Sequence, residues 1–150
     1  SQLAQWVEEQ FSGRLIFHSK AVALIENTPA AEVDMKLLCD ALEFLATEYR
    51  NELIGDITEE ERNLLCSKRY GRPFTVTPIK GMSPQAYPAE YKIKYYENEK
   101  GKKYESVLDL HLKVGNDSEN LLRIYFLYDK EKKLIVVGSL PKHLKTLTLG

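Results

Sequence analysis

Hydrophobic residues recur at helical spacing through the first half of the chain. Apolar positions three and four residues apart predict a short amphipathic helix over 2–11 and one continuous helix from about 30 to 53. The stripe of this longer helix is Val33, Leu37, Leu38, Ala41, Leu42, Leu45, Ala46 and Tyr49. Residues 14–27 are ambiguous, because the run Leu15-Ile16-Phe17 suits a strand while the later apolar spacing favours a helix.

A capping motif marks the start of a further helix. Thr58 and Glu61 have the spacing of a capping box, in which the threonine hydroxyl accepts a hydrogen bond from the amide three residues later. We expect this helix to run to about Lys68 and to bury Leu64 and Leu65.

From Phe74 onward the hydrophobic period is two, which is typical of strands. The pattern predicts strands at 74–78, 91–96, 108–114, 122–128 and 134–137. In the third of these, alternate residues are expected to share one apolar face, namely Leu108, Leu110, Leu112 and Val114. The segment 78–90 is rich in proline and glycine and is a candidate mobile loop, and 115–118 has the composition of a turn.

About four helices followed by about five strands predict an α+β fold, in which an N-terminal helical half packs on a C-terminal, mainly antiparallel sheet. We expect a single domain over 1–150, with a helical part at 1–71 and a sheet part at 72–150. A chain of this length buries enough surface to fold without a disulfide or metal staple.

The composition, with 43% hydrophobic and 29% charged residues, is that of a globular protein. The apolar runs are too short to span a bilayer, and the opening residues lack the basic-then-apolar pattern of a secretory signal. Two cysteines, Cys39 and Cys66, are too few for a secreted disulfide framework. We therefore expect a cytoplasmic protein with two reduced core thiols, the alternative being a bridge between two helices.

The net charge of −1 conceals an asymmetry along the chain. Residues 1–70 hold 7 Lys+Arg against 13 Asp+Glu, a balance of −6, whereas residues 71–150 hold 14 against 9, a balance of +5. A basic half suits contact with phosphates. It equally suits docking on the acidic half or on a second copy of the chain.

The three histidines are His18, His111 and His143, and no pair has the spacing of metal ligands. Phosphate-binding glycine motifs and nucleophile motifs are absent too, so we expect neither a metal nor a cofactor. His111 falls on the polar face of its strand and is expected to be exposed to solvent. His143 follows the last strand beside Lys142 and Lys145, where loop residues are well placed for binding.

Tyrosines and lysines alternate between 87 and 104 in a way that suits stacking on single-stranded nucleic acid. The in-and-out pattern of a half-buried strand is the simpler explanation of the same residues.

Three segments of the C-terminal half resemble a known group of proteins. They are His111-Leu112-Lys113-Val114-Gly115, then Leu122-Arg123-Ile124-Tyr125-Phe126, then Val136-Val137-Gly138-Ser139-Leu140-Pro141-Lys142-His143-Leu144. They resemble uncharacterised bacterial proteins of mobile elements and defence gene clusters, which carry HLK-x-G, RIYF and a glycine–histidine segment closing in HL. More distantly, the order of glycine turn, arginine-bearing strand, hairpin and basic tail is similar to RelE-like mRNA interferases of toxin–antitoxin systems.

This resemblance covers roughly residues 105–146. It implies that Arg123 contacts a phosphate and that Lys142 and His143 lie in a tail that approaches RNA. Two departures argue against catalysis: Ser139 stands where the first family has a histidine, and Pro141 stands where it often has glycine.

Three functions follow from these observations. The first is a small cytoplasmic protein of a mobile-element or defence system that binds RNA or DNA through Arg123, Lys142, His143 and Lys145. The second is a metal-independent mRNA interferase in which Arg123 stabilises negative charge and His143 is an acid or base. The third is a non-catalytic subunit that binds a protein partner, or a second copy, through its helical half or its sheet edge. No membrane contact is expected.

Overall fold

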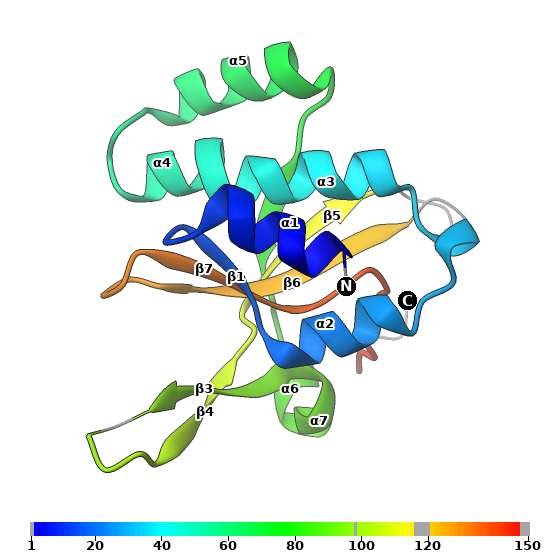
Figure 1. The fold of residues 1–150 in the computed structure, drawn as a ribbon, viewed down its shortest axis with the longest axis vertical. Coiled ribbons are helices and arrows are strands. Elements are labelled where there is room, and N and C mark those ends of the chain that lie inside the picture. Colours follow the sequence, from blue (N-terminus) through cyan, green and yellow to red (C-terminus); the bar gives the residue numbers. More distant parts are fainter. Residues whose placement is uncertain (1, 98, 116–120, 148–150) are drawn as a thin grey trace.

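Figure 1 shows the computed structural model, which describes residues 2–97, 99–115 and 121–147. Within these ranges a mixed sheet has five strands in the order β1-β7-β6-β5-β2. The strands are β1 (Leu15–Phe17), β2 (Thr75–Pro78), β5 (Leu110–Val114), β6 (Leu122–Asp129) and β7 (Leu134–Ser139). β1 pairs with β7 in parallel, and the other three pairings are antiparallel. The predicted α+β class, with N-terminal helices and C-terminal strands, is confirmed.

In the helical half, α1, α3 and α4 lie on one side of this sheet and α5 forms an outer layer beyond α3 and α4, whereas α2 lies on the other side of β1 from α1 in this view (Figure 1). The elements of the helical half are α1 (Gln2–Phe11), α2 (Ser19–Glu26), η1 (Ala30–Glu32), α3 (Met35–Phe44), η2 (Leu45–Tyr49), α4 (Arg50–Leu53) and α5 (Glu59–Tyr70). The larger hydrophobic core combines side chains of α1 and α3 with alternate residues of the strands, among them Leu112, Ile124 and Phe126. Residues from both halves of the sequence therefore share one core.

The other side of the sheet carries a two-stranded hairpin and two short helices (Figure 1). These elements are α6 (Ser83–Ala86), α7 (Pro88–Tyr91), β3 (Lys92–Glu97) and β4 (Lys103–Val107). A smaller core lies beneath them and consists of Tyr91, Ile93, Leu108, Tyr125, Leu127, Val136 and Leu144. Lys20 of α2 also donates to the carbonyl oxygen of Ala89 at 2.9 Å, which ties this layer to the helical half.

The long helix begins later than its apolar stripe predicts. The carboxylate of Asp34 accepts a hydrogen bond from the amide of Leu37, so Asp34 is the N-cap and 30–32 forms a separate 3-10 turn. Beyond Phe44 the helix continues through the π-helical turn η2 into α4 without a break in direction. The apolar stripe was correct, but Asp34 supplies a start signal that hydrophobic spacing alone does not contain.

Residues 14–27 form both elements that the sequence permits. β1 occupies 15–17 and α2 follows directly, so the helix favoured for this segment covers only its second part. His18 separates them, because its Nδ1 atom accepts a hydrogen bond from the amide of Lys20 and thereby caps α2. Its Nε2 atom lies 3.0 Å from the carbonyl oxygen of Lys94.

The capping box of α5 is confirmed, since both the Thr58 and the Glu61 side chains accept their reciprocal amide hydrogen bonds. The predicted burial of Leu64 and Leu65 is wrong, because these side chains are 61% and 37% exposed. The helix packs on η2 rather than on the sheet, and it does so through the buried Cys66.

Two further expectations for the sheet half are corrected. The segment 78–90 contains α6 and α7 instead of a mobile loop, and Ser83 and Pro84 in it are buried. Leu108 does not share a face with Leu112, because β4 ends at Val107 and Leu108 packs in the smaller core. The turn predicted at 115–118 lies outside the described residues except for Gly115, whose φ of 83° is in the left-handed region.

Cys39 and Cys66 are free thiols rather than a bridge between helices, and burial raises the pKa of both. Among the helices that the structure describes, none combines the length and the apolar character needed to cross a membrane.

Candidate functional site

A hollow of about 380 Å³ lies beside the smaller core, on the sheet side opposite the large helices. Its walls come from the end of β2, from β5 and β6, from the helix α6 region and from the segment after β7. The lining residues are Thr77, Pro78, Ile79, Lys80, Ser83, Tyr91, His111, Tyr125, His143 and Thr146. None of these described residues is acidic, so the hollow offers imidazoles, hydroxyls and an ammonium group. We call it the His111 hollow.

His111 lies in the middle of β5, opposite Tyr125 of β6 and Thr77 of the edge strand β2. The His111 and Tyr125 rings are stacked, with centroids 5.4 Å apart and planes 14° from parallel. Tyr125 is buried, and its hydroxyl accepts a hydrogen bond from the amide of Leu144. His111 is only half-buried, so the expectation of a fully solvent-exposed histidine was wrong.

The surroundings of His111 lower its pKa from the ordinary value of 6.5. Burial is the largest cause, and the positive charges of Arg123, His143 and Lys113 act in the same direction. The backbone of Thr77 has the opposite effect but does not prevail. His111 is therefore neutral near pH 7, and a neutral imidazole has one donor and one acceptor nitrogen.

His143 reaches the same hollow from the segment that follows β7. Three hydrogen bonds hold this segment against the sheet layer: the hydroxyl of Tyr91 donates to the Lys145 carbonyl, the Leu144 amide donates to the Tyr125 hydroxyl, and the Leu147 amide donates to the Ser83 hydroxyl. On the preceding side the Pro141 carbonyl accepts a hydrogen bond from the Arg123 amide at 2.9 Å, so the backbone is held both before and after His143.

Arg123 does not occupy the position that the resemblance implies for it. Its side chain is only 4% exposed, and its Nη1 atom donates to the carbonyl oxygens of Val114 and Leu122, each at 3.0 Å. A phosphate contact would require the guanidinium to leave these carbonyls and to move out of the protein. Arg123 instead contributes to the site through its charge, which acts on His111.

The two remaining residues predicted for nucleic-acid contact lie outside the His111 hollow. Lys142 is exposed, and its Nζ atom is 3.5 Å from a carboxylate oxygen of Glu32. Lys145 is exposed as well, with its amide 3.4 Å from the Glu90 carboxylate. Of these predicted residues, His143 thus lines the hollow, whereas Lys142 and Lys145 lie outside it.

Sequence reasoning missed Lys80 and His111 as members of the site. Lys80 is an exposed residue that follows β2 in the segment expected to be a mobile loop. The amide of the preceding Ile79 donates to the Asp109 carbonyl at 2.8 Å, a contact between residues distant in sequence. The HLK-x-G motif was the one sequence feature that could have marked His111 as a site residue. Its half-buried position could not be predicted, because it depends on which layer covers that face of the sheet.

In the parts of the chain that the structure describes, no group of three or more His, Cys, Asp or Glu side chains is placed to hold a metal ion. No family model, no curated protein and no solved structure matches the chain. The fold and the hollow define an α+β protein with a histidine-lined, acid-free site on one face of its sheet.

Proposed function

We propose that this protein binds single-stranded nucleic acid in the His111 hollow. The observation that carries the proposal is the convergence of His111, His143, Tyr125 and Lys80 in one hollow that has no acidic lining residue. These side chains come from distant parts of the sequence, so ordinary strand patterning does not explain their meeting.

The phosphate backbone would be held by the cationic side of the hollow. Lys80 supplies an ammonium group, and the charges of Lys113 and Arg123 add positive potential close by. Backbone phosphates dominate the affinity of most nucleic-acid-binding proteins, and lysine is a suitable point charge for them.

An unpaired base would be held by the aromatic side. The stacked pair of His111 and Tyr125 forms a preorganised π-surface, of which the half-buried His111 is the accessible member. Stacking on aromatic side chains tolerates any base but requires that the base be unpaired. This preference favours single strands over duplexes. By the resemblance noted above, such a protein belongs to a mobile-element or defence system.

The proposal is tested by fluorescence-anisotropy titration against single-stranded RNA, single-stranded DNA and duplex DNA of matched length and composition. We expect single strands to bind more tightly than the duplex, and the affinity to fall as salt rises, because phosphate neutralisation releases counterions.

The decisive variants are Lys80→Ala and His111→Ala, with Lys130→Ala as the matched control. Lys130 is an exposed lysine of the same basic half, at the turn between β6 and β7. Lys80→Ala is expected to weaken binding and to reduce the salt dependence, whereas Lys130→Ala leaves both unchanged. Equal losses in Lys80→Ala and Lys130→Ala would show that binding is a diffuse charge effect and would overturn the assignment of the site.

A second candidate function is supported by the pair of histidines. In a metal-independent mRNA interferase, neutral His111 would remove the proton of a ribose 2′-hydroxyl, and the 2′-oxygen would attack the adjacent phosphorus. His143 would protonate the departing 5′-oxygen, while Lys80 would stabilise the charge on the phosphoryl oxygens in the place first assigned to Arg123. Ser139 still departs from the family pattern that suggests this chemistry.

Cleavage separates the two candidates. The protein is incubated with single-stranded RNA in the presence of EDTA, with and without translating ribosomes, and single-stranded DNA of the same sequence is the control substrate. An interferase yields cleaved RNA and intact DNA, and loses activity in both His111→Ala and His143→Ala. If the protein binds the RNA but cleaves it under neither condition, the interferase function is excluded and only the binding function remains.

A further inference from the structure

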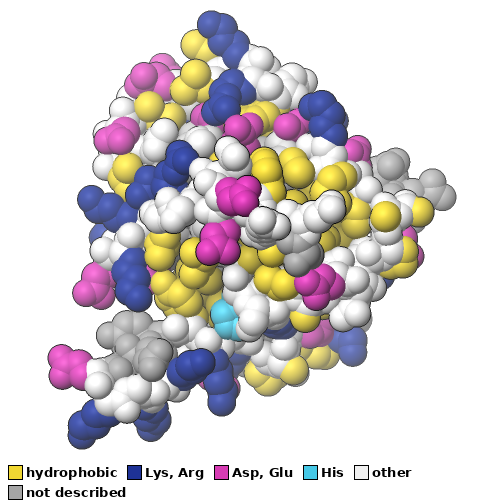
Figure 2. All heavy atoms as spheres, in the orientation of Figure 1, with side chains coloured by type: hydrophobic (Ala, Val, Ile, Leu, Met, Phe, Trp, Pro, Cys, Tyr) yellow, Lys and Arg dark blue, Asp and Glu magenta, His cyan; other side chains and the backbone are white. Residues whose placement is uncertain are grey.

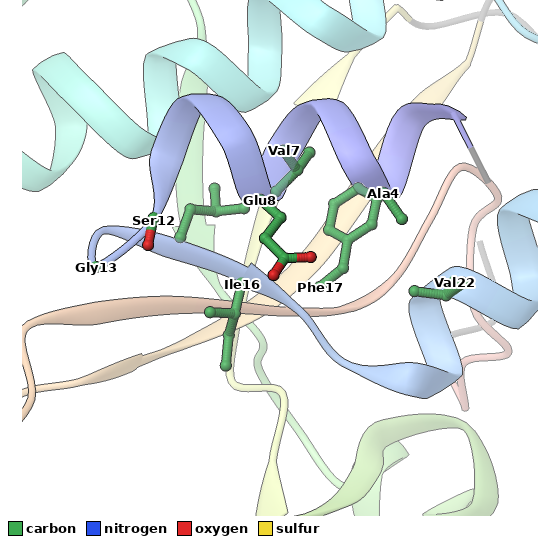
Figure 3. A pocket seen from close by; sticks show the side chains of 9 residues that line it. Ala4, Val7, Glu8, Ser12, Gly13, Ile16, Phe17 and Val22 are labelled. Carbon is green, nitrogen blue, oxygen red and sulfur yellow. The ribbon is translucent and has the colours of Figure 1, made fainter.

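A second groove, of about 360 Å³, runs along the edge strand β1 beneath helix α1. Figure 3 shows its walls: α1 lies above, β1 forms the floor, and Val22 of α2 stands at one end. Its lining residues are Ala4, Val7, Glu8, Ser12, Gly13, Leu15, Ile16, Phe17 and Val22. None of them belongs to the His111 hollow, so this groove is a separate site.

The backbone of β1 has unused hydrogen-bonding groups on the groove side. The Arg14 carbonyl accepts from the Ile135 amide and the His18 amide donates to the Val137 carbonyl, both at 2.9 Å. Because successive residues of a strand direct their polar groups to opposite edges, residues 14, 16 and 18 face β7, and Leu15 and Phe17 face away from it. No backbone hydrogen bond between described residues reaches Leu15 or Phe17 from that outer side.

The side chains around the groove combine an apolar surface with one negative charge. In Figure 3, Glu8 extends down from α1 towards β1, and its carboxylate lies above the strand near Ile16 and Phe17. The small residues Ala4 and Ser12 stand one helical turn to either side of it. Figure 2 shows acidic side chains over α1 and an apolar area that extends over β1. Within the described ranges, Glu8 has no ion-pair partner.

We propose that this groove binds an extended, basic segment of a partner protein, which adds to the sheet as a strand beside β1. Its backbone would pair with the outward amides and carbonyls of Leu15 and Phe17, as in other cases of strand addition to a sheet edge. Side chains on one face of the segment would pack beside Phe17 and those on the opposite face beside Ile16, because successive residues of β1 alternate between the two faces of the sheet. A lysine or arginine on the α1 side would pair with Glu8.

The charge of Glu8 decides between this occupant and two others. A second copy that paired its own β1 antiparallel about Ile16 would bring the α1 helices to the same face of a continuous sheet, with the two Glu8 carboxylates facing each other. Such a like-charge contact disfavours the self-pairing. A nucleic-acid strand would place phosphates against the same carboxylate. A basic peptide alone satisfies both the backbone groups and the charge.

The first test uses a fluorescein-labelled, capped peptide of alternating valine and lysine, titrated against the whole protein by anisotropy. We expect Glu8→Lys to weaken its binding by about tenfold or more, and Glu9→Lys to change it by less than about twofold. Glu9 is the neighbouring acidic residue of α1 and does not line the groove, so it controls for net charge. Equal effects of the two reversals would overturn the proposal.

The second test reads the strand pairing residue by residue, by amide hydrogen exchange. Without peptide the Ile16 amide is protected by β7, whereas the Leu15 and Phe17 amides exchange faster. We expect the peptide to slow exchange at Leu15 and Phe17 and to leave Ile16 unchanged. A version of the peptide with alternate amides N-methylated keeps its charge but is expected not to bind.

Two outcomes contradict this geometry. Peptide binding without any change at Leu15 and Phe17 would mean that the peptide is held by charge elsewhere on the molecule. A dimeric mass in sedimentation, with both amides already protected in the free protein, would mean that a second copy occupies the groove.

Discussion

Arg123 shows how a charged residue in a sheet can serve the fold rather than a ligand. Its Nη1 atom donates to the carbonyl oxygens of Val114 and Leu122, which lie where β5 ends and β6 begins. Its backbone amide donates to the Pro141 carbonyl at 2.9 Å. A single residue thus connects three consecutive segments of the sheet half.

Replacing this guanidinium should therefore reduce stability. We expect Arg123→Met to lower the free energy of unfolding by about 2–3 kcal/mol, because buried carbonyls lose a charged donor and gain no other. Lys113→Met is the matched control, since Lys113 is exposed and lies directly opposite Arg123 on β5. It should change stability by less than about 0.5 kcal/mol. Urea unfolding monitored by circular dichroism measures both, and equal stabilities of the two variants would contradict this role of Arg123.

His111 gives the stability of the protein a dependence on pH. Its pKa in the folded protein lies below the 6.5 of an unperturbed histidine, so the unfolded chain binds the proton more strongly. The contribution of neutral His111 is complete above about pH 7 and decreases as the pH falls through 6.5 towards the folded-state pKa. We expect the wild type to lose more stability than His111→Gln between pH 7.5 and pH 5.5.

The carboxylates titrate equally in both proteins, so the difference between their unfolding free energies isolates His111. An NMR titration of the His111 ring protons provides an independent measurement. A midpoint at or above 6.5 would contradict the arrangement of positive charges around the ring.

At the level of elements, one buried carboxylate contributes several of the polar contacts between helix α5 and the rest of the protein. Glu48 lies in the π-helical turn η2 and is 2% exposed. Arg69 of α5 donates to it at 2.6 Å, and the hydroxyl of Tyr70 and the neighbouring Thr47 also contact it. The wider turn of η2 places Glu48 on the side that faces α5. Burial raises the pKa of the Tyr70 hydroxyl, and the negative charge of Glu48 acts in the same direction.

We expect Glu48→Gln to destabilise the protein by about 1–2 kcal/mol, because Arg69 and Tyr70 lose a charged acceptor in a buried position. We expect a smaller loss of stability than for a fully buried ion pair, because the Arg69 side chain is 42% exposed and solvent screens its charge. Glu43→Gln removes the other carboxylate that pairs with Arg69, at 3.2 Å, and should cost less than about 0.5 kcal/mol, since Glu43 is 35% exposed. Thermal unfolding of the two variants ranks the contacts, and the reverse order would be inconsistent with attachment through Glu48.

The elements themselves were largely predictable, because hydrophobic period and capping chemistry are local. The capping box at Thr58, the strands β6 and β7 and most of the long helix follow from residues within a few positions of each other. The errors concern which elements pack against each other. Leu64 and Leu65 have the spacing of core residues, but α5 lies on η2 rather than on the sheet. Leu108 likewise fits the alternation of Leu110 and Leu112 but belongs to the other core.

The candidate site was less predictable for the same reason. His143 was found because it follows a strand in a basic segment. His143 and His111 line the same hollow only because the C-terminal segment folds back over the sheet. This segment is held by a hydrogen bond donated by the Tyr91 hydroxyl and one accepted by the Ser83 hydroxyl, both residues distant in sequence. The burial of the Arg123 side chain was not predicted, because a family motif states residue type and not the direction of the side chain.

On the scale of the whole molecule, the hairpin layer is joined to the sheet where Leu108 meets Gly138. A Cβ atom at Gly138 would lie 2.5 Å and 2.8 Å from the two methyl groups of Leu108, which is fully buried. We expect Gly138→Ala to destabilise the protein by about 1–3 kcal/mol through overpacking. The double variant Gly138→Ala/Leu108→Val should recover part of this loss. Denaturant unfolding of the wild type, the two single variants and the double variant measures the four free energies of unfolding that reveal it. Strict additivity would exclude a direct conflict between the two side chains.

The parallel pairing of β1 with β7 also determines the order in which the protein can form during synthesis. β1 leaves the ribosome more than a hundred residues before β7, which is its only strand partner among the described residues. Until β7 is made, the backbone of β1 lacks this partner and the apolar side chains of Leu15 and Phe17 are only partly packed. Such exposed apolar segments favour chaperone binding over early folding. Ribosome-bound chains that stop before Leu134 should consequently remain sensitive to protease, and resistance should appear only once β7 has cleared the exit tunnel.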